Sequence, residues 1–453
     1  MSTLFFANAL LPDGWARNIL VETDADGMIT GVTKDAKADA AGVAGQIAVP
    51  GMANLHSHAF QRAMAGLGEW RGAASDDSFW TWREIMYRFL ERLGPDDVRA
   101  IASQIYVEMA EAGFTAVGEF HYLHHQPDGT PYANLAEMAE QIVAATDTAG
   151  IALTLLPVYY EYGGFGGQPA GGAQARFAND PDRFLRLRDE CRRLGDDNRR
   201  TIVGAAPHSL RAVTPESLAQ VVSACADGPL HIHVAEQMKE VDECLAALGA
   251  RPVEWLLDNH NVDGHWCLIH ATHMSGEETQ RLAASGAAAG LCPITEANLG
   301  DGIFNGVAYH EAGGRFGVGS DSNVRVDLAE ELRSLEYSQR LRDRGRNRIA
   351  ADGMANGRTL FDAAVRGGAQ ALAQPMGRIA PGCYCDLVSL DADHPALAGK
   401  SGDDILNGWI FSGDKSCVSD VWIGGRHMVR DGRHVNRDAA LAGFHRTMDR
   451  LRD

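Results

Sequence analysis

The sequence lacks the cysteine patterns that mark disulfide-stabilised or zinc-ribbon proteins. Its eight cysteines include no C-x-x-C pair, and their spacing suggests no disulfide framework. Cys383 and Cys385, one residue apart, are more typical of a turn than of a zinc site. The first six residues, 1–6, lack the basic and long apolar regions of a signal peptide. We therefore expect a reduced, cytoplasmic protein.

Long apolar runs and an excess of positive charge are also absent. No run is apolar enough to span a membrane. The net charge of −19 argues against a nucleic-acid or anionic-membrane partner, because both are bound through basic surfaces. It does not exclude an anionic small molecule, since a few buried arginines can set a local field against the global one. The 453 residues, 45% apolar and 22% charged, are typical of a globular protein with one large and one smaller domain.

The middle of the chain alternates strand-like and helical stretches. Eight short apolar runs are separated by helical segments, at 52–58, 114–120, 151–158, 201–206, 230–234, 267–270, 288–293 and 315–321. This alternation predicts an α/β fold in which a parallel sheet closes into a (β/α)₈ TIM barrel over residues 50–375.

Strand signals without helices occupy both chain ends. Residues 1–49 carry short apolar runs broken by turns, and strands return at 386–390, 417–423 and 427–429. The simplest account pairs the two ends with each other. We therefore expect residues 1–49 and 376–453 to form one small composite β-sandwich domain beside the barrel.

Two histidines end the first expected barrel strand. His56 and His58 are one residue apart, so on a strand their imidazoles project to the same side. Alone, this spacing is more typical of a solvated strand face. However, His233, His270 and Asp321 fall at the ends of other strands, where barrel enzymes carry their chemistry. Three histidines and a carboxylate suit Zn²⁺ with a water completing the site.

Each of these residues also has an ordinary structural explanation. A core histidine often bonds to a backbone carbonyl, and an aspartate often caps a helix. Their coincidence at strand ends favours the metal site. Glu236, three residues after His233, has two explanations. Its negative charge suits the N-terminus of a helix, and its carboxyl group also suits a proton shuttle. The barrel favours the second role.

On these motifs the chain resembles the amidohydrolase superfamily, in its mononuclear-zinc deaminase branch. The matching segments are 50–58, 231–236, 268–273, 319–323 and 377–388, so the resemblance covers nearly the whole chain. The binuclear branch usually needs a bridging lysine, often at the end of strand four. Lysine is absent from 40–238, which predicts a single metal.

Within that superfamily the chain is most similar to the formimidoylglutamate deiminases of histidine degradation. The similarity lies in segments 56–62, 80–84, 119–122, 207–211 and 292–302. It implies a homodimer and a substrate site made of Gln61, Arg83, Tyr122, His208 and Arg211.

Residue chemistry agrees with a dicarboxylate substrate. N-formimidoyl-L-glutamate has an amidine-like head and two carboxylates, and the arginine fork binds carboxylates bidentately. Arg211 follows a strand end, which favours a functional role. Arg83 is equally well explained as a solvated helix charge beside Glu84. Trp80 and Trp82 are more typical of packing than of stacking on a substrate ring.

The mechanism expected from this resemblance uses one Zn²⁺ per chain to lower the pKa of a water toward about 7. His56, His58, His233 and Asp321 would hold the metal. Asp321 would take the water proton, His270 would orient the hydroxide, and Glu236 would protonate the departing nitrogen. The products would be N-formyl-L-glutamate and ammonia.

Two other interpretations stay open. The same scaffold serves deaminases of purine, pyrimidine or related rings, although a ring pocket would favour stacking aromatics and amides over two arginines. The second interpretation is a metal-dependent binding or scaffold protein that catalyses no reaction. Metal-dependent turnover distinguishes this last interpretation from both enzymes.

Overall fold

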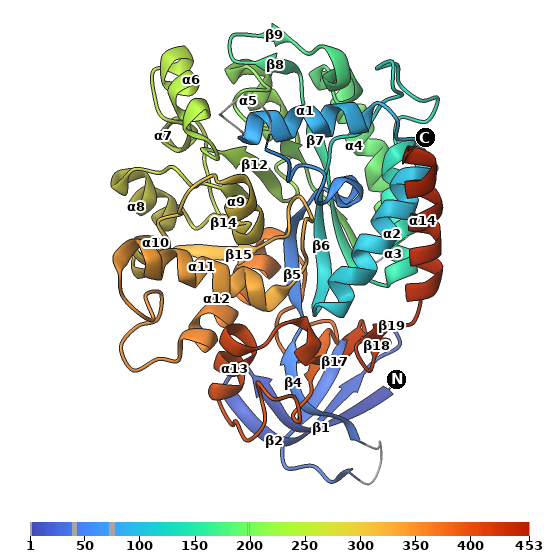
Figure 1. The fold of residues 1–453 in the computed structure, drawn as a ribbon, viewed down its shortest axis with the longest axis vertical. Helices are drawn as coiled ribbons and strands as arrows, with labels where there is room; N and C mark the ends of the chain where they lie inside the picture. The colour runs from blue at the N-terminus through green and yellow to red at the C-terminus, as the bar shows by residue number, and fades with distance from the viewer. Residues whose placement is uncertain (1, 39–42, 72–77, 197, 199, 453) are drawn as a thin grey trace.

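The computed structural model describes residues 2–38, 43–71, 78–196, 198 and 200–452. Both chain ends contribute to a β-sheet at one end of the molecule, and the middle of the chain builds a barrel at the other (Figure 1). The α/β barrel with a β region drawn from both ends, as expected from the sequence, is confirmed.

The sheet at the chain ends is one mixed sheet of eight strands in the order β19-β18-β17-β16-β4-β1-β2-β3. Its strands are β1 (Ser2–Leu11), β2 (Gly14–Thr23), β3 (Ile29–Thr33), β4 (Val43–Pro50), β16 (Leu387–Leu390), β17 (Val418–Ile423), β18 (Arg426–Arg430) and β19 (Arg433–His434). All neighbours are antiparallel except β1 and β4. The two chain ends meet where β4 pairs with β16. Of these strands, β3 and β19 were not predicted.

The barrel is assembled from two curled parallel sheets. Its strands are β5 (Met52–Ser57), β6 (Phe114–His121), β7 (Ala152–Tyr159), β10 (Thr201–Val203), β11 (Ala206–Pro207), β12 (Leu230–Val234), β13 (Trp266–His270), β14 (Ala288–Leu291) and β15 (Arg315–Val318). Bridges between Ser57 and Asp321, and between Ala205 and Leu230, join the two sheets into a closed ring.

The fourth barrel strand is divided where it changes partner. β10 and β11 both pair with β7. Between them, the Ala205 N–H donates to Pro229 O at 3.0 Å, and the His231 N–H donates to Ala205 O at 3.1 Å. The break therefore lets one short stretch bond to β7 and β12 in turn.

Helices surround the barrel (Figure 1). They are α1 (Phe79–Leu90), α2 (Pro95–Glu111), α3 (Glu137–Ala149), α4 (Pro181–Asp196), α5 (Pro215–Ala224), α6 (Met238–Leu248), α7 (Pro252–Asn259), α8 (Gly276–Ser285), α9 (Pro293–Leu299), α10 (Gly306–Glu311), α11 (Leu328–Asp343), α12 (Asn356–Ala371), α13 (Asp404–Ser412) and α14 (Arg437–Arg452). Short 3₁₀ turns are η2 (Ala59–Met64), η3 (Gly172–Arg176) and η4 (Lys415–Cys417), and a small hairpin is formed by β8 (Tyr162–Gly164) and β9 (Gln168–Pro169).

Local sequence explains the helices that were predicted. In α2 the stripe of Val98, Ile101, Ile105 and Met109 is buried against the barrel, as its spacing indicates. In α5 the Thr214 hydroxyl accepts the Ser217 N–H at 3.2 Å, and a proline occupies the first helical position. Both helices lie among the helical segments expected between the barrel strands.

The last helix leaves the terminal sheet and packs beside α2 of the barrel (Figure 1). We propose the division expected from the sequence, with 50–375 as the barrel and both ends as a composite domain, and we add that α14 extends this domain along the barrel wall. Limited proteolysis that releases residues 50–375 as a stable fragment would support it.

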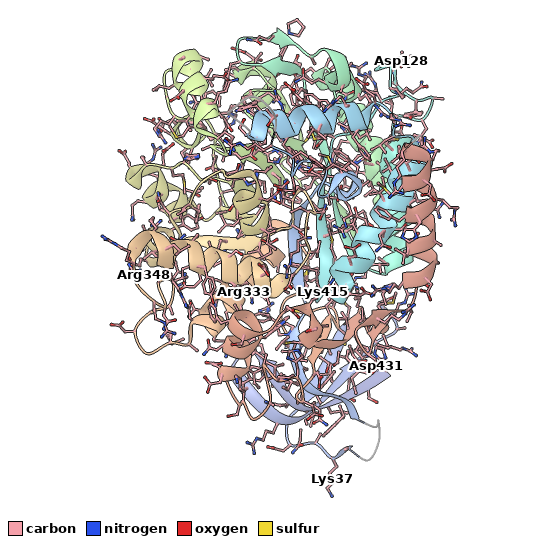
Figure 2. The ribbon with its side chains drawn as sticks, in the orientation of Figure 1. Lys37, Asp128, Arg333, Arg348, Lys415 and Asp431 are labelled. Carbon is pink, nitrogen blue, oxygen red and sulfur yellow. The ribbon has the colours of Figure 1, made fainter. Side chains whose placement is uncertain are left out.

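Charged side chains such as Lys37, Asp128, Arg348 and Asp431 lie on the outside of the molecule (Figure 2). Among the helices in the described ranges, none combines the length and apolar character needed to cross a bilayer.

Candidate active site

The end of β5 and the loop after β15 are joined through their main chains. The Asp321 N–H donates to His56 O at 3.0 Å, and the His58 N–H donates to Asp321 O at 3.0 Å. These two bonds fix Asp321 against both histidines. The amide of Asn323 reinforces the join by donating to the carbonyls of His58 and Asp321, each at 3.0 Å.

Ring nitrogens and a carboxylate oxygen converge at this join. Nε2 of His56 and Nε2 of His233 are 3.1 Å apart. Oδ1 of Asp321 lies 3.6 Å from Nε2 of His56 and 3.4 Å from Nε2 of His58. Ligand atoms bound at about 2.0–2.2 Å to a tetrahedral zinc lie roughly 3.3–3.6 Å apart, so these separations fit a zinc-sized ion.

The protonation of the rings also fits a cation. Nδ1 of His58 bonds to Phe120 O at 3.0 Å, and Nδ1 of His233 bonds to His208 O at 3.1 Å. A carbonyl accepts only an N–H, so in the neutral rings the lone pairs sit on Nε2 and face one another. Burial lowers the pKa of all three rings, that of His58 to about 3, which keeps them neutral.

Asp321 supplies the negative charge of the cluster. Burial alone would raise the pKa of this carboxyl, but the nearby histidines, His56 first among them, hold the pKa well below its usual range. Three neutral imidazoles and one carboxylate are a donor set suited to a divalent transition metal.

Several residues at these strand ends have left-handed backbone conformations. His270 has φ +66° and Asp321 has φ +45°, and Ala235 and Ala271 have φ +51° and +47°. Such conformations are uncommon for residues other than glycine, and they cluster at functional sites. Gly319 meets a second constraint, because a Cβ there would lie 2.7 Å from His56 O.

A second group of titratable side chains adjoins the cluster. Nε2 of His270 lies 3.7 Å from Oε1 of Glu236 and 3.7 Å from Oδ2 of Asp321. Burial alone would lower the pKa of His270, but Glu236, with Glu296 and Asp321, raises it to about 10. Burial raises the pKa of Glu236, against the opposing charge of His270. Glu236 can therefore hold a proton near neutral pH, as a proton shuttle requires.

Beside these groups is a cavity lined by polar and apolar side chains, a composition typical of small-molecule sites. All of the site residues expected from the sequence line it, except His56: these are His58, Gln61, Arg83, Tyr122, His208, Arg211, His233, Glu236, His270 and Asp321. His56 is fully buried next to His58.

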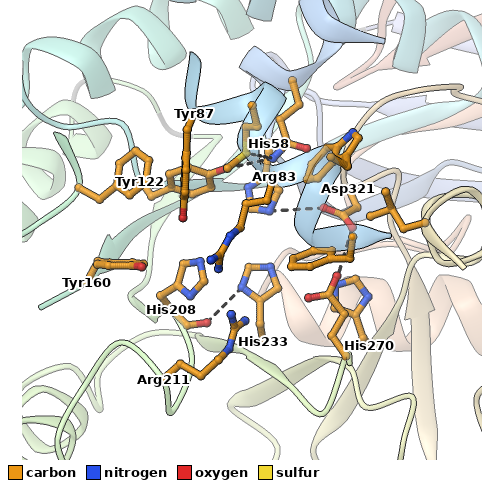
Figure 3. A pocket seen from close by; sticks show the side chains of 17 residues that line it. His58, Arg83, Tyr87, Tyr122, Tyr160, His208, Arg211, His233, His270 and Asp321 are labelled. Carbon is orange, nitrogen blue, oxygen red and sulfur yellow. Dashed lines mark hydrogen bonds and ion pairs between the residues drawn. The ribbon is translucent and has the colours of Figure 1, made fainter. Parts of the chain in front are cut away.

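Two arginines face the cavity from opposite segments. The guanidinium groups of Arg83, on α1, and Arg211, after β11, point into the space beside His208 (Figure 3). Within the described part of the chain, the ion pair of Arg211 is with Glu240, whose Oε2 lies 3.8 Å from Nε. Among the described residues, Arg83 has only aromatic contacts, over Trp80 at 4.6 Å and over Tyr87 at 5.4 Å. Both arginines therefore keep N–H donors available for a ligand.

The other expected substrate residues form a polar wall beside the arginines. Nε2 of Gln61 donates to the Tyr122 hydroxyl at 2.9 Å, while the carbonyl oxygen of the same amide is buried and has no partner among the described residues. Burial and the charge of Arg211 lower the pKa of His208 well below its usual range. Its neutral ring is therefore a donor or acceptor for a ligand.

Sequence reasoning missed other parts of this site. Tyr87 and Tyr160 line the cavity, and Trp82, interpreted as packing, also reaches it. Glu296 bonds His270 but does not line the cavity. Tyr160 directly follows the third barrel strand, so the strand-end rule that found the histidines could also have found it.

Comparisons with known proteins were made with the sequence and with the fold. Residues 47–428 match the profile of the amidohydrolase family, and residues 1–46 match the N-terminal domain of formimidoylglutamate deiminase HutF. Formimidoylglutamate deiminase of Pseudomonas aeruginosa is 52% identical over 455 residues, covering 100% of both chains.

Solved structures share the whole fold. An amidohydrolase from Brucella melitensis superposes with a TM-score of 0.96 at 52% identity, covering 100% of both chains. A zinc-bound adenosine deaminase from Xanthomonas campestris superposes with a TM-score of 0.83 at 21% identity, covering 99% of this chain and 98% of its own. This second likeness concerns the fold alone.

Together, the barrel, the histidine cluster at its strand ends and the full-length matches define the relationship. The chain belongs to the amidohydrolase family and, within it, to the formimidoylglutamate deiminases.

Proposed function

We propose that this protein hydrolyses N-formimidoyl-L-glutamate to N-formyl-L-glutamate and ammonia, a step of histidine degradation. The observation that carries the proposal is the division of one cavity between two kinds of group. Two arginines with available donors face one part, and the histidine–carboxylate cluster faces the other. A substrate with two carboxylates and an amidine-like head matches this division. The full-length likeness to a formimidoylglutamate deiminase supports it.

The proposed cofactor is one Zn²⁺ per chain, held by His56, His58, His233 and Asp321. The short separations and inward lone pairs of these groups support it. When bound, the metal supplies Lewis acidity that lowers the pKa of a water toward about 7. Metal analysis should find about one ion per chain, as a mononuclear site requires. Two tightly bound ions at full activity would contradict this count.

Proton transfer is assigned to residues that surround the reacting carbon. Water adds to the formimino carbon, the bond from that carbon to the terminal nitrogen breaks, and both water protons end on ammonia. Asp321 takes the first proton from the attacking water. Glu236 delivers a proton to the departing nitrogen, and His270 orients the water between these two carboxylates. The 3.7 Å distances from His270 to both carboxylates support this arrangement.

Substrate orientation is assigned to the arginine part of the cavity. Arg83 and Arg211 bind the two carboxylates, and Gln61, Tyr122 and His208 complete the contacts. The net charge of −19 would repel a dianion, so these cations supply the local field that admits it.

The decisive experiment is an ammonia-release assay of zinc-loaded protein. We expect metal-dependent turnover of formimidoylglutamate and little turnover of a panel of purine, pyrimidine and related ring amines. Preferential turnover of a ring amine would replace the proposal with a ring deaminase. No turnover of any compound by the metal-loaded protein would favour a binding role.

We further propose a homodimer in a reducing, cytoplasmic compartment. All eight cysteines are free and buried, which suits that compartment. Sedimentation at several concentrations would test the dimer.

A further inference from the structure

Glu296 touches the site from behind. Its Oε1 lies 3.2 Å from Nδ1 of His270, on the far edge of the ring from Glu236 and Asp321. The side chain is 6% exposed and does not line the cavity. A substrate in the cavity would therefore meet His270 but not Glu296, so Glu296 can act only through the histidine.

The carboxylate of Glu296 is held in place by its own helix. The Cys292 N–H donates to the same Oε1 at 2.9 Å. Pro293 starts α9, and the Asp301 N–H bonds to Glu296 O at 2.9 Å after the helix ends. The oxygen next to His270 is thus fixed by an N–H that compels it to accept, whatever the state of the ring.

A histidine has two distinct ring nitrogens, and the partner of one decides what the other presents. Oε1 of Glu296 already accepts the Cys292 N–H, so it is placed to accept a hydrogen bond from the N–H of Nδ1. Because Nδ1 is committed in this way, the ring cannot exchange its two nitrogens without breaking a buried hydrogen bond.

We propose that Glu296 is a positioning residue that keeps a proton on Nδ1 of His270, so that Nε2 is the nitrogen presented to Glu236, Asp321 and the attacking water. The kinetic consequence rests on the proposed function of His270, whereas the ring geometry does not. Fixing Nδ1 holds Nε2 at 3.7 Å from both carboxylates. Glu296 thereby sets the direction in which the water is oriented.

The first test reads the ring directly. Zinc-loaded holoenzyme labelled with ¹⁵N-histidine should show a proton attached to Nδ1 of His270, assigned as the signal lost in His270→Asn. Glu296→Gln should keep this proton, because the Cys292 N–H holds the amide oxygen in the acceptor position. Glu296→Leu should lose it or show exchange between nitrogens.

The second test measures the rate of formimidoylglutamate turnover in the Glu296 variants. Changing a hydrogen-bond partner behind a site residue typically costs about 10–100-fold in activity. We expect Glu296→Leu to fall in this range with its metal retained, and Glu296→Gln to fall less than tenfold. This recovery by the conservative variant separates positioning from simple packing.

Asp301→Asn is the matched control. Asp301 lies in the segment that follows α9, and its carboxyl is within 4.8 Å of His270 and Glu236, with no recorded hydrogen bond to the ring. Burial raises the pKa of this carboxyl, so an amide mimics its protonated form. The control should keep the Nδ1 proton of His270.

Three outcomes would overturn the proposal. They are an unprotonated Nδ1 in the wild type, an unchanged ring and rate in Glu296→Leu, and the same loss of the Nδ1 proton in Asp301→Asn. If Glu296→Leu does not fold, the wild type and Glu296→Gln still test the proposal, because it requires a proton on Nδ1 of His270 in both proteins. A protonated Nδ1 in a protein that does not turn over formimidoylglutamate would support this inference while rejecting the proposed function.

Discussion

The two parts of the cavity rest on different kinds of support. The histidine side, made of His56, His58, His233, His270 and Asp321, stands on barrel strand ends and is fixed by main-chain bonds and left-handed backbone. The arginine side combines Tyr122 and His208, which directly follow β6 and β11, with Gln61 of η2, Arg83 of α1 and Arg211 beyond β11. There, Arg83 is held by aromatic faces and not by hydrogen bonds recorded among the described residues.

This difference suggests a division of labour. A metal and its water need ligand atoms placed to a few tenths of an ångström, and barrel strands supply that precision. Carboxylate recognition tolerates more movement, because a guanidinium has five donors in a fork. If this division holds, a substitution on the histidine side should leave carboxylate binding measurable, and a substitution on the arginine side should leave the metal bound.

The largest effect is expected from removing a metal ligand. His233→Ala should lose the metal and essentially all turnover, because the imidazole has no substitute at the end of β12. Binding of the product N-formyl-L-glutamate, measured by calorimetry, should persist through the arginines. Loss of product binding together with the metal would show that the two sides are not separable.

Removing the proton shuttle comes next. Glu236→Gln should keep the metal and lower kcat by about 10²–10⁴-fold, the usual contribution of a general acid–base group. His270→Asn should behave in the same direction. Metal analysis beside single-turnover rates gives both readouts, and metal lost with activity would place the mutated residue among the ligands.

On the other side, Arg211→Met should act on substrate binding. A buried charged group that loses its partner typically costs about 2–5 kcal/mol, or roughly 30- to several thousand-fold in kcat/KM. The metal should stay. An analogue without the side-chain carboxylate should be poor for the wild type and lose less on mutation of the arginine that binds that group. If Arg83→Met and Arg211→Met both leave turnover intact, the dicarboxylate assignment fails.

A smaller effect concerns stability and pH. His121 ends β6, its Nε2 is buried with no hydrogen-bond partner in the described ranges, and burial lowers its pKa to about 3. Its unfolded form takes a proton below about pH 6.5 while the folded form stays neutral, so stability falls with falling pH, by at most about 1.4 kcal/mol per pH unit. The free energy of unfolding, measured with denaturant at several pH values between 7 and 5, should fall less steeply with falling pH in His121→Asn than in the wild type. If the free energy of unfolding depends on pH equally in both proteins, His121 is protonated in the folded protein.

The smallest effect should come from the aromatic support of Arg83. Trp80 lies under Arg83 at 4.6 Å and under Lys239 of α6 at 4.3 Å. Exposed cation–π contacts contribute about 0.5–1 kcal/mol, so Trp80→Leu should raise KM by roughly two- to fivefold with kcat little changed. The same substitution in an Arg83→Met background should add nothing. A fall in kcat instead would connect Trp80 with the histidine side.

The two sides also differed in how far the sequence predicted them. Strand alternation placed His56 and His58 on one face, and the strand-end rule added His233, His270 and Asp321, because these positions depend on local periodicity. Arg83 had an equally good explanation as a solvated charge, and only family resemblance favoured a role for it. Glu296 was not predicted at all. Its contact with His270 depends on how α9 packs behind β13, and no local pattern encodes that meeting of distant segments.

The pairing of β4 with β16 carries a consequence for how the protein is made. Residues 47–50 bond to residues 387–390, so their partner strand is translated only after the whole barrel. At about 5–20 residues per second, the N-terminal strands wait for tens of seconds beside the ribosome with one edge unpaired. An unpaired edge can join with another chain. Nascent chains on crowded polysomes are therefore exposed to aggregation through β4, and slow translation or chaperone depletion should lower the yield of native enzyme.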